Sequence, residues 1–354
     1  MELTGKNPLL FQHADHRNQC SSSGFGEREG ILRAAVIGYG HFGRYHSQKY
    51  ASSHGALLTA IVDPSQDRRH LALETHPSVL VFADIDAMLA EMTPDIASVV
   101  VPATRHYDIS RRLLENGVHL LLEKPLTSSA DDARKLAQIA RFRSLVLQPG
   151  YLERFHAPFI ELQLAIPEPS YFEARRLTPW SGRGTDVSVI MDLMTHDIDL
   201  ALQLVGEEVV NIQARGKRTV SQHWDFVDAR LEFSGGCVAR LLASRIGPRD
   251  QRFCIFSKSA YAVFDGNDRT LRQSRIGDDG ISNEIRYCPG SDLLAAEIDH
   301  FIQVVHGRQS PEMTASDGCV VLELAQRINA AAISQEFRLP LPDLWQIGGR
   351  IFVQ

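Results

Sequence analysis

The chain has 354 residues, of which 44% are hydrophobic and 23% are charged, and its formal net charge is −6. This length exceeds what one hydrophobic core usually organises, so we expect two domains of an ordinary globular protein. The negative charge argues against nucleic acid as a partner, and no apolar run reaches the ~18 residues needed to cross a membrane. The five cysteines form no close pair, which favours reduced thiols in a cytoplasmic protein over a disulfide framework.

The stretch from residue 33 to about residue 150 alternates short apolar runs with spacers long enough for helices. The runs are continuously apolar, as expected when crossover helices cover both faces of a parallel sheet. They lie at residues 34–37, 57–62, 79–82, 96–101, 118–122 and 145–150. We therefore predict an α/β domain with a doubly wound parallel sheet over residues 31–150, after a flexible lead-in over residues 1–30.

A glycine-rich turn follows the first of these runs. Gly38, Gly40 and Gly43 form a G-x-G-x-x-G motif that opens into a helix near Phe42. In such a motif the first glycine makes a tight turn, the second lets the backbone approach a pyrophosphate, and the third lets the helix pack closely on the strand. The motif predicts a Rossmann domain that binds a dinucleotide at the helix N-terminus, with an ordinary glycine-rich turn as the alternative.

Asp63 ends the second apolar run and favours the dinucleotide interpretation. A carboxylate at that strand end can accept hydrogen bonds from both ribose hydroxyls, although an Asp-Pro turn that merely closes a strand is the alternative. Because the carboxylate also repels a 2′-phosphate, we predict NAD rather than NADP as the cofactor. Arg68 and Arg69 lie close enough in sequence to keep NADP open.

Polar residues follow the fourth and fifth runs, where ligands bind in a doubly wound sheet. His106 comes after the fourth run, and a hydrogen-bonded structural histidine is as good an interpretation as a cofactor contact. Lys124 follows the fifth run, and its position beside the expected nicotinamide favours a chemical role over a solvated surface lysine. The predicted cofactor-binding residues are Gly38, Tyr39, Gly40, His41, Phe42, Gly43, Asp63, Pro102, Thr104, His106, Glu123 and Lys124.

Beyond residue 150 the pattern changes to strand-like runs joined by short polar turns, which favours antiparallel pairing. The runs lie at residues 170–177, 208–216, 226–234, 237–245, 252–257 and 261–265. A helix is expected near residues 156–165, and helices near 188–205, 291–307 and 316–335 are expected to cover one face of the sheet. We predict an α+β domain with an open, mainly antiparallel sheet over residues 151–335. Residues 336–354 are expected to pack back as a return segment, with Trp345 and Phe352 as anchors.

The expected helix at residues 188–205 separates into two faces when its residues are laid out at the ~100° per residue of an α-helix. The polar stripe holds Ser188, Asp192, Thr195, His196, Asp199 and Gln203, and the apolar side holds Ile190, Leu193, Met194, Ile198, Ala201, Leu204 and Val205. Asp192 and His196 lie one turn apart, so both can address one substrate hydroxyl, with a solvated polar face as the alternative. Asp197 falls on the apolar side, where we predict an arginine or backbone N–H groups as its partner. No second histidine stands at ligand spacing, so no metal is expected.

Together these residues resemble the Gfo/Idh/MocA family of NAD(P)-dependent sugar oxidoreductases over nearly all of residues 33–340. The matching features are Gly38 to Gly43, Asp63, Pro102 to His106, Glu123-Lys124-Pro125, Gly150 to Phe155, and Asp192, His196, Asp197 and Asp199. The resemblance implies that Lys124, Asp192 and His196 fill the family's catalytic positions. It also implies a homo-oligomer formed through the open sheet.

Within the family, residues 153–155, 175–179 and 182–190 look most like the branch of UDP-N-acetylglucosamine 3-dehydrogenases. Those enzymes oxidise the 3-hydroxyl of the sugar to a ketone, which is later aminated for lipid A or surface glycans. One departure is His156, where the branch implies asparagine. The expected substrate-binding residues are Arg154, Arg175, Arg176 and Arg183, with solvated arginines as an equal alternative.

The resemblance thus implies NAD-dependent oxidation of a small-molecule sugar or nucleotide sugar, with neither nucleic acid nor membrane as a partner. Three alternatives stay open. The substrate can be another sugar or inositol, the protein can be a non-catalytic NAD(H) sensor, or bound NAD can be reduced and reoxidised within one cycle.

Overall fold

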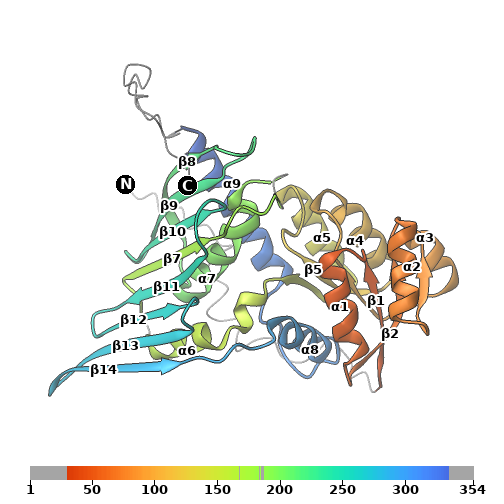
Figure 1. Ribbon diagram of the computed structural model, residues 1–354, viewed down its shortest axis with the longest axis horizontal. Helices are drawn as coiled ribbons and strands as arrows, with labels where there is room; N and C mark the ends of the chain where they lie inside the picture. The colour runs from red at the N-terminus through yellow and green to blue at the C-terminus, as the bar shows by residue number, and fades with distance from the viewer. Residues whose placement is uncertain (1–29, 167, 183, 185–186, 335–354) are drawn as a thin grey trace, which may run out of the picture.

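The computed structural model describes residues 30–166, 168–182, 184 and 187–334, and it contains two β-sheets with helices packed around and between them (Figure 1). The first sheet lies among helices of the N-terminal half, and the second is a broad, strongly twisted sheet. Within these described ranges, no helix is both long and apolar enough to cross a membrane.

The first sheet contains the six predicted runs as parallel strands. They are β1 (Leu32–Ile37), β2 (Ala56–Val62), β3 (Leu80–Phe82), β4 (Ile96–Val99), β5 (His119–Glu123) and β6 (Leu147–Gly150). Their order is β3-β2-β1-β4-β5-β6, which is the doubly wound order of a Rossmann domain, so this part of the predicted fold is confirmed. Pro149 lies in β6, an edge strand, where the missing N–H does not interrupt the ladder.

Helices cover both faces of this sheet. They are α1 (His41–Ala51), α2 (Gln66–Thr75), α3 (Ile85–Glu91), α4 (His106–Glu115), α5 (Ala130–Phe142) and the short η1 (Ala103–Arg105). Three of them begin at a side chain that accepts a hydrogen bond from the first turn, namely Ser65 for α2, Asp84 for α3 and Ser129 for α5. The two faces carry separate apolar clusters, one with Leu113 and Leu136 and the other with Tyr50 and Leu121.

The second sheet is open and mainly antiparallel, as predicted. Its strands are β7 (Tyr171–Leu177), β8 (Val209–Lys217), β9 (Phe226–Phe233), β10 (Val238–Ser244), β11 (Asp250–Phe256), β12 (Ala260–Asp265), β13 (Thr270–Gly277) and β14 (Gly280–Tyr287). The strand order is β14-β13-β12-β11-β7-β10-β9-β8, and only the β7–β10 pair is parallel.

The hairpin of β13 and β14 was not predicted. All of β14 is exposed, so this hairpin lacks the alternation of buried and exposed residues that marks a strand in sequence. The available signal was the sequence Gly277-Asp-Asp-Gly280 between the strands, in which Asp278 and Asp279 make the turn and Gly280 has a φ of 111°.

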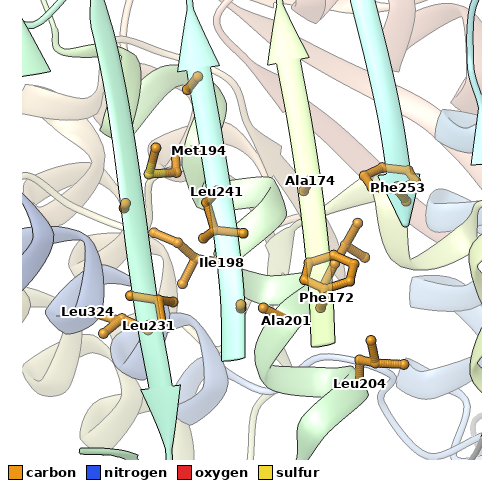
Figure 2. Close-up of a cluster of buried hydrophobic side chains, with 14 of the residues drawn as sticks. Phe172, Ala174, Met194, Ile198, Ala201, Leu204, Leu231, Leu241, Phe253 and Leu324 are labelled. Atoms are coloured by element: carbon orange, nitrogen blue, oxygen red, sulfur yellow. The ribbon is translucent and has the colours of Figure 1, made fainter. Parts of the chain in front are cut away.

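One face of the second sheet is covered by helices. Figure 2 shows Met194, Ile198, Ala201 and Leu204 packed against side chains of the sheet. These residues belong to η3 (Ile190–Met194) and α7 (Thr195–Val205), and α9 (Ala315–Ser334) packs beside them. The turn η2 (Leu152–Phe155) and α6 (Ala157–Ala165) follow β6.

The helix α8 (Leu293–Val305) corrects one prediction. Its sequence was expected to cover the second sheet, but α8 packs against α1 and β5 (Figure 1). Phe301 and Ile302 complete the apolar cluster on that face of the first sheet. An amphipathic pattern shows that a helix buries one side, but it does not identify the surface that covers it. The predicted lead-in and the return segment with Trp345 and Phe352 lie outside the described residues.

Candidate active site

The glycine turn has the geometry that the motif predicted. Gly38 has a φ of 97°, and a Cβ there would collide with the carbonyl of Val100. A Cβ on Gly43 would collide with the Gly38 carbonyl, which explains why α1 packs so closely on the turn. At Gly40 the nearest atom to an added Cβ is Arg68 Nη1 at 3.9 Å. The backbone is therefore open at Gly40, as binding of a pyrophosphate requires.

Asp63 lies beneath this turn and is only 1% exposed. Its Oδ2 accepts the backbone N–H of Tyr39 at 2.7 Å, and its Oδ1 accepts the N–H of Ser65 at 2.9 Å. Arg68 Nη1 lies 3.5 Å from Oδ2 on a side chain that is 56% exposed. A buried carboxylate thus fixes the turn, and an exposed cation lies beside the predicted ribose position. The role of Asp63 as a ribose ligand stays a prediction.

His106 has a structural role in the described protein. It is buried, and its ring nitrogens lie 2.8 Å from the carbonyl oxygens of Val101 and Pro125. The ring therefore bridges the segments that follow β4 and β5, and neither nitrogen is free for a cofactor. Pro102 and Thr104 are exposed above it, so contact with a cofactor by these two residues stays a prediction.

Lys124 brings the two halves of the chain together. Its Nζ donates a hydrogen bond to the main-chain oxygen of Asp192 and lies 3.2 Å from Asp192 Oδ1. Lys124 follows β5 of the first sheet, whereas Asp192 lies in η3, which packs on the covered face of the second sheet. The carboxyl end of the parallel sheet thus faces the helical segment that carries the other candidate groups.

That segment is not the single regular helix that was predicted. Residues Ile190–Met194 form a π-helical turn, and the α-helix begins at Thr195. The layout at ~100° per residue therefore fails between Asp192 and His196. Thr195 and Asp199, expected on a stripe facing the cleft, are buried instead, and Thr195 Oγ1 donates to the Met191 carbonyl at 3.1 Å.

His196 is well suited to accept a proton. Burial, followed by the charges of Lys124 and Arg176, holds the pKa of His196 well below its ordinary value of 6.5. The imidazole is therefore neutral at neutral pH. Its ring packs edge-on against Tyr151, with 5.8 Å between centroids, and within the described residues its Nδ1 has no hydrogen-bond partner.

Two buried ion pairs hold the residues that follow His196 in α7. Asp197 pairs with Arg176, whose Nη2 lies 2.7 Å from Asp197 Oδ1, which confirms the predicted arginine partner. Arg176 also donates to Glu153 at 2.7 Å. Arg154 Nε donates to Asp199 Oδ2 at 2.8 Å. These pairs brace α7 against η2 and β7, and we call them the α7 brace.

The four arginines expected to bind substrate do not form one cluster. Arg154 and Arg176 are buried in the α7 brace. Arg175 is adjacent to Arg176 in β7, so it points to the opposite face, where it lies 3.2 Å from Asp250. Arg183 lies outside the described residues. Binding of substrate by these arginines stays a prediction, and the structure gives three of them other partners.

Two polar residues near the site were missed from the sequence. Tyr151 is buried against His196, and His46 of α1 contacts Glu123, with Nε2 and Oε1 3.1 Å apart. The available signal for His46 was its position among residues of α1 that face the sheet, where a histidine needs a buried polar partner.

Two family models match the chain. One, described as an oxidoreductase family with an NAD-binding Rossmann fold, matches residues 32–151. The other, the GFO/IDH/MocA C-terminal domain, matches residues 164–263.

Several relatives are similar along most of the chain. The UDP-N-acetylglucosamine 3-dehydrogenase of Acidithiobacillus ferrooxidans is 35% identical over 309 residues, covering 85% of this chain and 97% of its own. The scyllo-inositol 2-dehydrogenase (NAD(+)) of Bacillus subtilis is 24% identical over 340 residues, covering 88% and 95%.

Solved structures agree with this similarity. That of the Acidithiobacillus ferrooxidans enzyme has a TM-score of 0.80 at 34% identity and covers 86% of this chain and 99% of its own. The fold also matches scyllo-inositol dehydrogenase from Lactobacillus casei with bound NAD(H) and scyllo-inositol, with a TM-score of 0.75 at 18% identity, covering 86% and 98%. With its glycine turn, its two sheets and matched models on both halves, the chain belongs to the GFO/IDH/MocA family of oxidoreductases.

Proposed function

We propose that the protein is an NAD-dependent dehydrogenase that oxidises a hydroxyl of a sugar to a ketone. The observation that carries the proposal is the contact between Lys124 and Asp192, which joins the carboxyl end of the first sheet to the segment that carries His196. An ammonium group, a carboxylate and a neutral imidazole would then act together at the carboxyl end of the first sheet.

Each of these side chains has a role that suits its surroundings. The neutral imidazole of His196 accepts the hydroxyl proton as the carbon that carries the hydroxyl is oxidised. The ammonium group of Lys124 stabilises the negative charge that develops on the oxygen. Asp192, over a third exposed, keeps one carboxylate oxygen near Lys124 and orients the hydroxyl with the other.

The residues around the glycine turn fit a dinucleotide. Gly38, Gly40 and the N-terminus of α1 would hold the pyrophosphate, and Asp63 would hold the adenosine ribose. NAD, when bound, supplies the hydride acceptor. We favour NAD over NADP because the Asp63 carboxylate is fixed at that position, although Arg68 is near enough to offset part of its charge.

For the substrate we propose the 3-hydroxyl of UDP-N-acetylglucosamine, which would give a 3-keto sugar for a later amination. The support is the greater similarity to the UDP-N-acetylglucosamine 3-dehydrogenase than to the inositol dehydrogenases. Oxidation of an inositol or another free sugar is the second candidate, because such enzymes are also similar over most of this chain.

The test is formation of NADH when purified protein is mixed with NAD and UDP-N-acetylglucosamine, followed by fluorescence. Free N-acetylglucosamine, myo-inositol and scyllo-inositol, each with and without UDP, form the comparison panel. Turnover of the nucleotide sugar alone supports the proposal, whereas turnover of an inositol favours the second candidate. Product without a stoichiometric amount of NADH would indicate redox-neutral chemistry, and binding of NADH without turnover of any substrate would indicate a sensor.

We also propose that the protein is a homo-oligomer formed through the second sheet. Helices cover one face of this sheet, whereas the other face carries a hollow lined by residues of β7 and β11 to β14. Three exposed apolar side chains line it, Phe256, Tyr261 and Ile285. Exposed apolar side chains among polar ones on a broad sheet suit contact with a second copy of the chain.

A further inference from the structure

A buried polar cluster lies behind the segment that carries Lys124. His46 of α1 is 3.1 Å from Glu123 Oε1 through Nε2 and 3.1 Å from Ser98 Oγ through Nδ1. Tyr50 OH lies 2.9 Å from the same Ser98 Oγ. Glu123 also accepts the backbone N–H of Lys124 through Oε2 at 3.3 Å. A chain of hydrogen bonds therefore connects the helix of the dinucleotide turn to the backbone of the candidate catalytic lysine.

Glu297 of α8 completes this cluster without joining its hydrogen bonds. It is 0% exposed, and neither carboxyl oxygen has a hydrogen-bond partner within the described residues. The helix α8 packs against both α1 and β5, which places Glu297 near Tyr50 and Glu123. An ionised carboxylate with no partner in such a place costs several kcal/mol, so the carboxyl group is expected to keep its proton.

Within the part of the chain that the structure describes, no cation pairs with Glu297, and burial and the charge of Glu123 are what shift its pKa. Several charged or titratable groups on α8 and the adjacent elements have other partners: Lys49 with Asp292, Glu153 with Arg176, Arg154 with Asp199, His119 with the Val146 N–H, and His300 with Gln309. The charge that acts on Glu297 is that of Glu123, a second carboxylate.

The pKa values of the Glu297 and Glu123 carboxyl groups are shifted in opposite directions. Burial, and then the charge of Glu123, raises the pKa of Glu297 well above its ordinary value of 4.5. Burial alone would also raise the pKa of Glu123, but the hydrogen bond to His46 and the charges of His46 and Lys124 hold it below its ordinary value. Two buried carboxylates of which one acts on the other through its charge cannot both ionise at little cost, so a single negative charge resides on Glu123.

We propose that Glu297 is a positioning residue of the active site, the protonated member of a buried carboxyl pair that leaves Glu123 as the single negative charge between His46 and Lys124. A second charge on Glu297 would repel Glu123 and loosen its contacts with both neighbours. The assignment of the proton needs no substrate, whereas the effect on Lys124 rests on the proposed function.

The first test measures thermal unfolding of the full chain between about pH 6 and about pH 9 for wild type, Glu297→Gln and the exposed control Glu74→Gln. A group whose pKa is raised by folding stabilises the protein fully below its unfolded pKa, and this stability is lost as the pH rises through the folded pKa. Gln carries no such proton. The melting temperature of Glu297→Gln minus that of wild type should therefore increase as the pH rises. For Glu74→Gln the same difference should stay constant with pH.

The change with pH in the melting-temperature difference between Glu297→Gln and wild type decides the outcome. A difference that is the same at every pH reflects only a change in packing. A flat difference, or a gain for wild type at high pH, would overturn the proton assignment. Glu297→Met provides a second neutral variant, since the carboxyl oxygens have no partner to lose, and the same slope is expected. If neither variant folds, the wild-type infrared spectrum decides: a protonated carboxyl C=O band near neutral pH that is lost at high pH supports the assignment, and its absence contradicts it.

The second test measures kcat and KM against pH with the substrate found in the panel above. If ionisation of Glu297 loosens Lys124, the fall of kcat at alkaline pH should move to higher pH in Glu297→Gln, while KM for NAD stays within about threefold of wild type. Identical alkaline limbs would refute the positioning role. If wild type turns over no substrate, the proposed function fails, and the unfolding experiment still decides the proton assignment.

Discussion

Lys124 and Asp192 are 68 positions apart in sequence, yet their side chains meet. The contact places an ammonium group beside a carboxylate. Burial, and then the charges of Lys124 and Arg176, lowers the pKa of His196. Oxidation of an alcohol requires a neutral base that accepts the hydroxyl proton. It also requires a cation beside the base that stabilises the negative charge on the oxygen. Three predictions concern single residues of the candidate active site and of the predicted cofactor site.

The first concerns the cation. Replacement of Lys124 by Ala removes the group that stabilises charge on the substrate oxygen, so kcat should fall by about 10²- to 10⁴-fold. Binding of NAD, measured by fluorescence titration, should persist because the glycine turn is unchanged. Lys135→Ala, at an exposed position of α5, is the matched control and should keep wild-type turnover. Near-normal turnover of Lys124→Ala would refute the proposed role.

The second concerns pH. Because the pKa of His196 lies below its ordinary value of 6.5, the base stays neutral as the solution is acidified past that value. The acid limb of kcat/KM should therefore lie below pH 6.5, and the measurement is the pH profile of kcat/KM for the free enzyme. An acid limb centred above pH 6.5 would show that the imidazole is not the base or is not desolvated.

The third concerns cofactor choice. Asp63→Asn keeps the shape of the side chain but removes the charge that repels a 2′-phosphate, and it leaves Arg68 beside the ribose position. The ratio of kcat/KM for NAD to that for NADP should fall by at least tenfold in Asp63→Asn. Arg69, which donates to the carbonyls of Asp63 and Pro64, serves as a comparison, since Arg69→Lys should change the ratio little. An unchanged ratio in Asp63→Asn would assign cofactor choice to another residue.

Among the helices, α7 is held in place by Arg154 and Arg176, two arginines that were expected to bind substrate. Arg154 and Arg176 reach Asp199 and Asp197, which follow His196 in α7, so the α7 brace fixes the helix that carries the candidate base. The π-helical turn before it allows Asp192 to face Lys124. A local irregularity and long-range ion pairs together orient the catalytic segment.

This arrangement separates a structural role of Arg154 from a role in binding substrate. Arg154→Met leaves Asp199 charged, buried and unpaired, so the free energy of unfolding should fall by about 3–5 kcal/mol, measured by denaturant titration. Adding Asp199→Asn should recover part of the loss.

Arg240, which pairs with Asp228 at the surface, provides the control, and Arg240→Met should cost less than about 1 kcal/mol. If Arg154→Met instead keeps wild-type stability and raises only KM for substrate, the substrate role inferred from the family resemblance is correct.

At the scale of the whole molecule, α9 connects the two sheets. It contacts β8 of the second sheet and α5 beside the first, and Gly318 allows it to approach Leu126 and Pro149 closely. The helices α8 and α9 follow the strands of the second sheet in the chain and thus bring it back to the first sheet. The opposite face of the second sheet is left to solvent or to another copy.

Oligomer formation can be tested on that face. Tyr261 is 43% exposed and lines the hollow there, so Tyr261→Arg should move the mass measured by light scattering toward that of a single chain. Phe142 is 90% exposed at the end of α5, away from this face, and Phe142→Arg should leave the mass unchanged. A wild-type protein that is monomeric at all concentrations would contradict the proposed assembly.

Features that depend on local patterns could be predicted from the amino-acid sequence. Continuous apolar runs predicted the strands of the first sheet because both of their faces are covered. The spacing of Gly38, Gly40 and Gly43 predicted the turn, in which Gly38 and Gly43 leave no room for a Cβ and the backbone is open at Gly40. The charge of Asp197 on an apolar face predicted a buried partner, an arginine or backbone N–H groups, and Arg176 is that partner.

Which surfaces and charges meet could be seen only in the folded protein. The apolar side of α8 would have suited either sheet, and it packs on the first. The arginines of β7 look alike in sequence, but neighbouring residues of a strand point to opposite faces, and only Arg176 reaches Asp197. The role proposed for Glu297 depends on the charge of Glu123, which lies on a strand far away in the chain. Periodicity records that a side chain is buried, whereas its partner depends on how distant segments pack together.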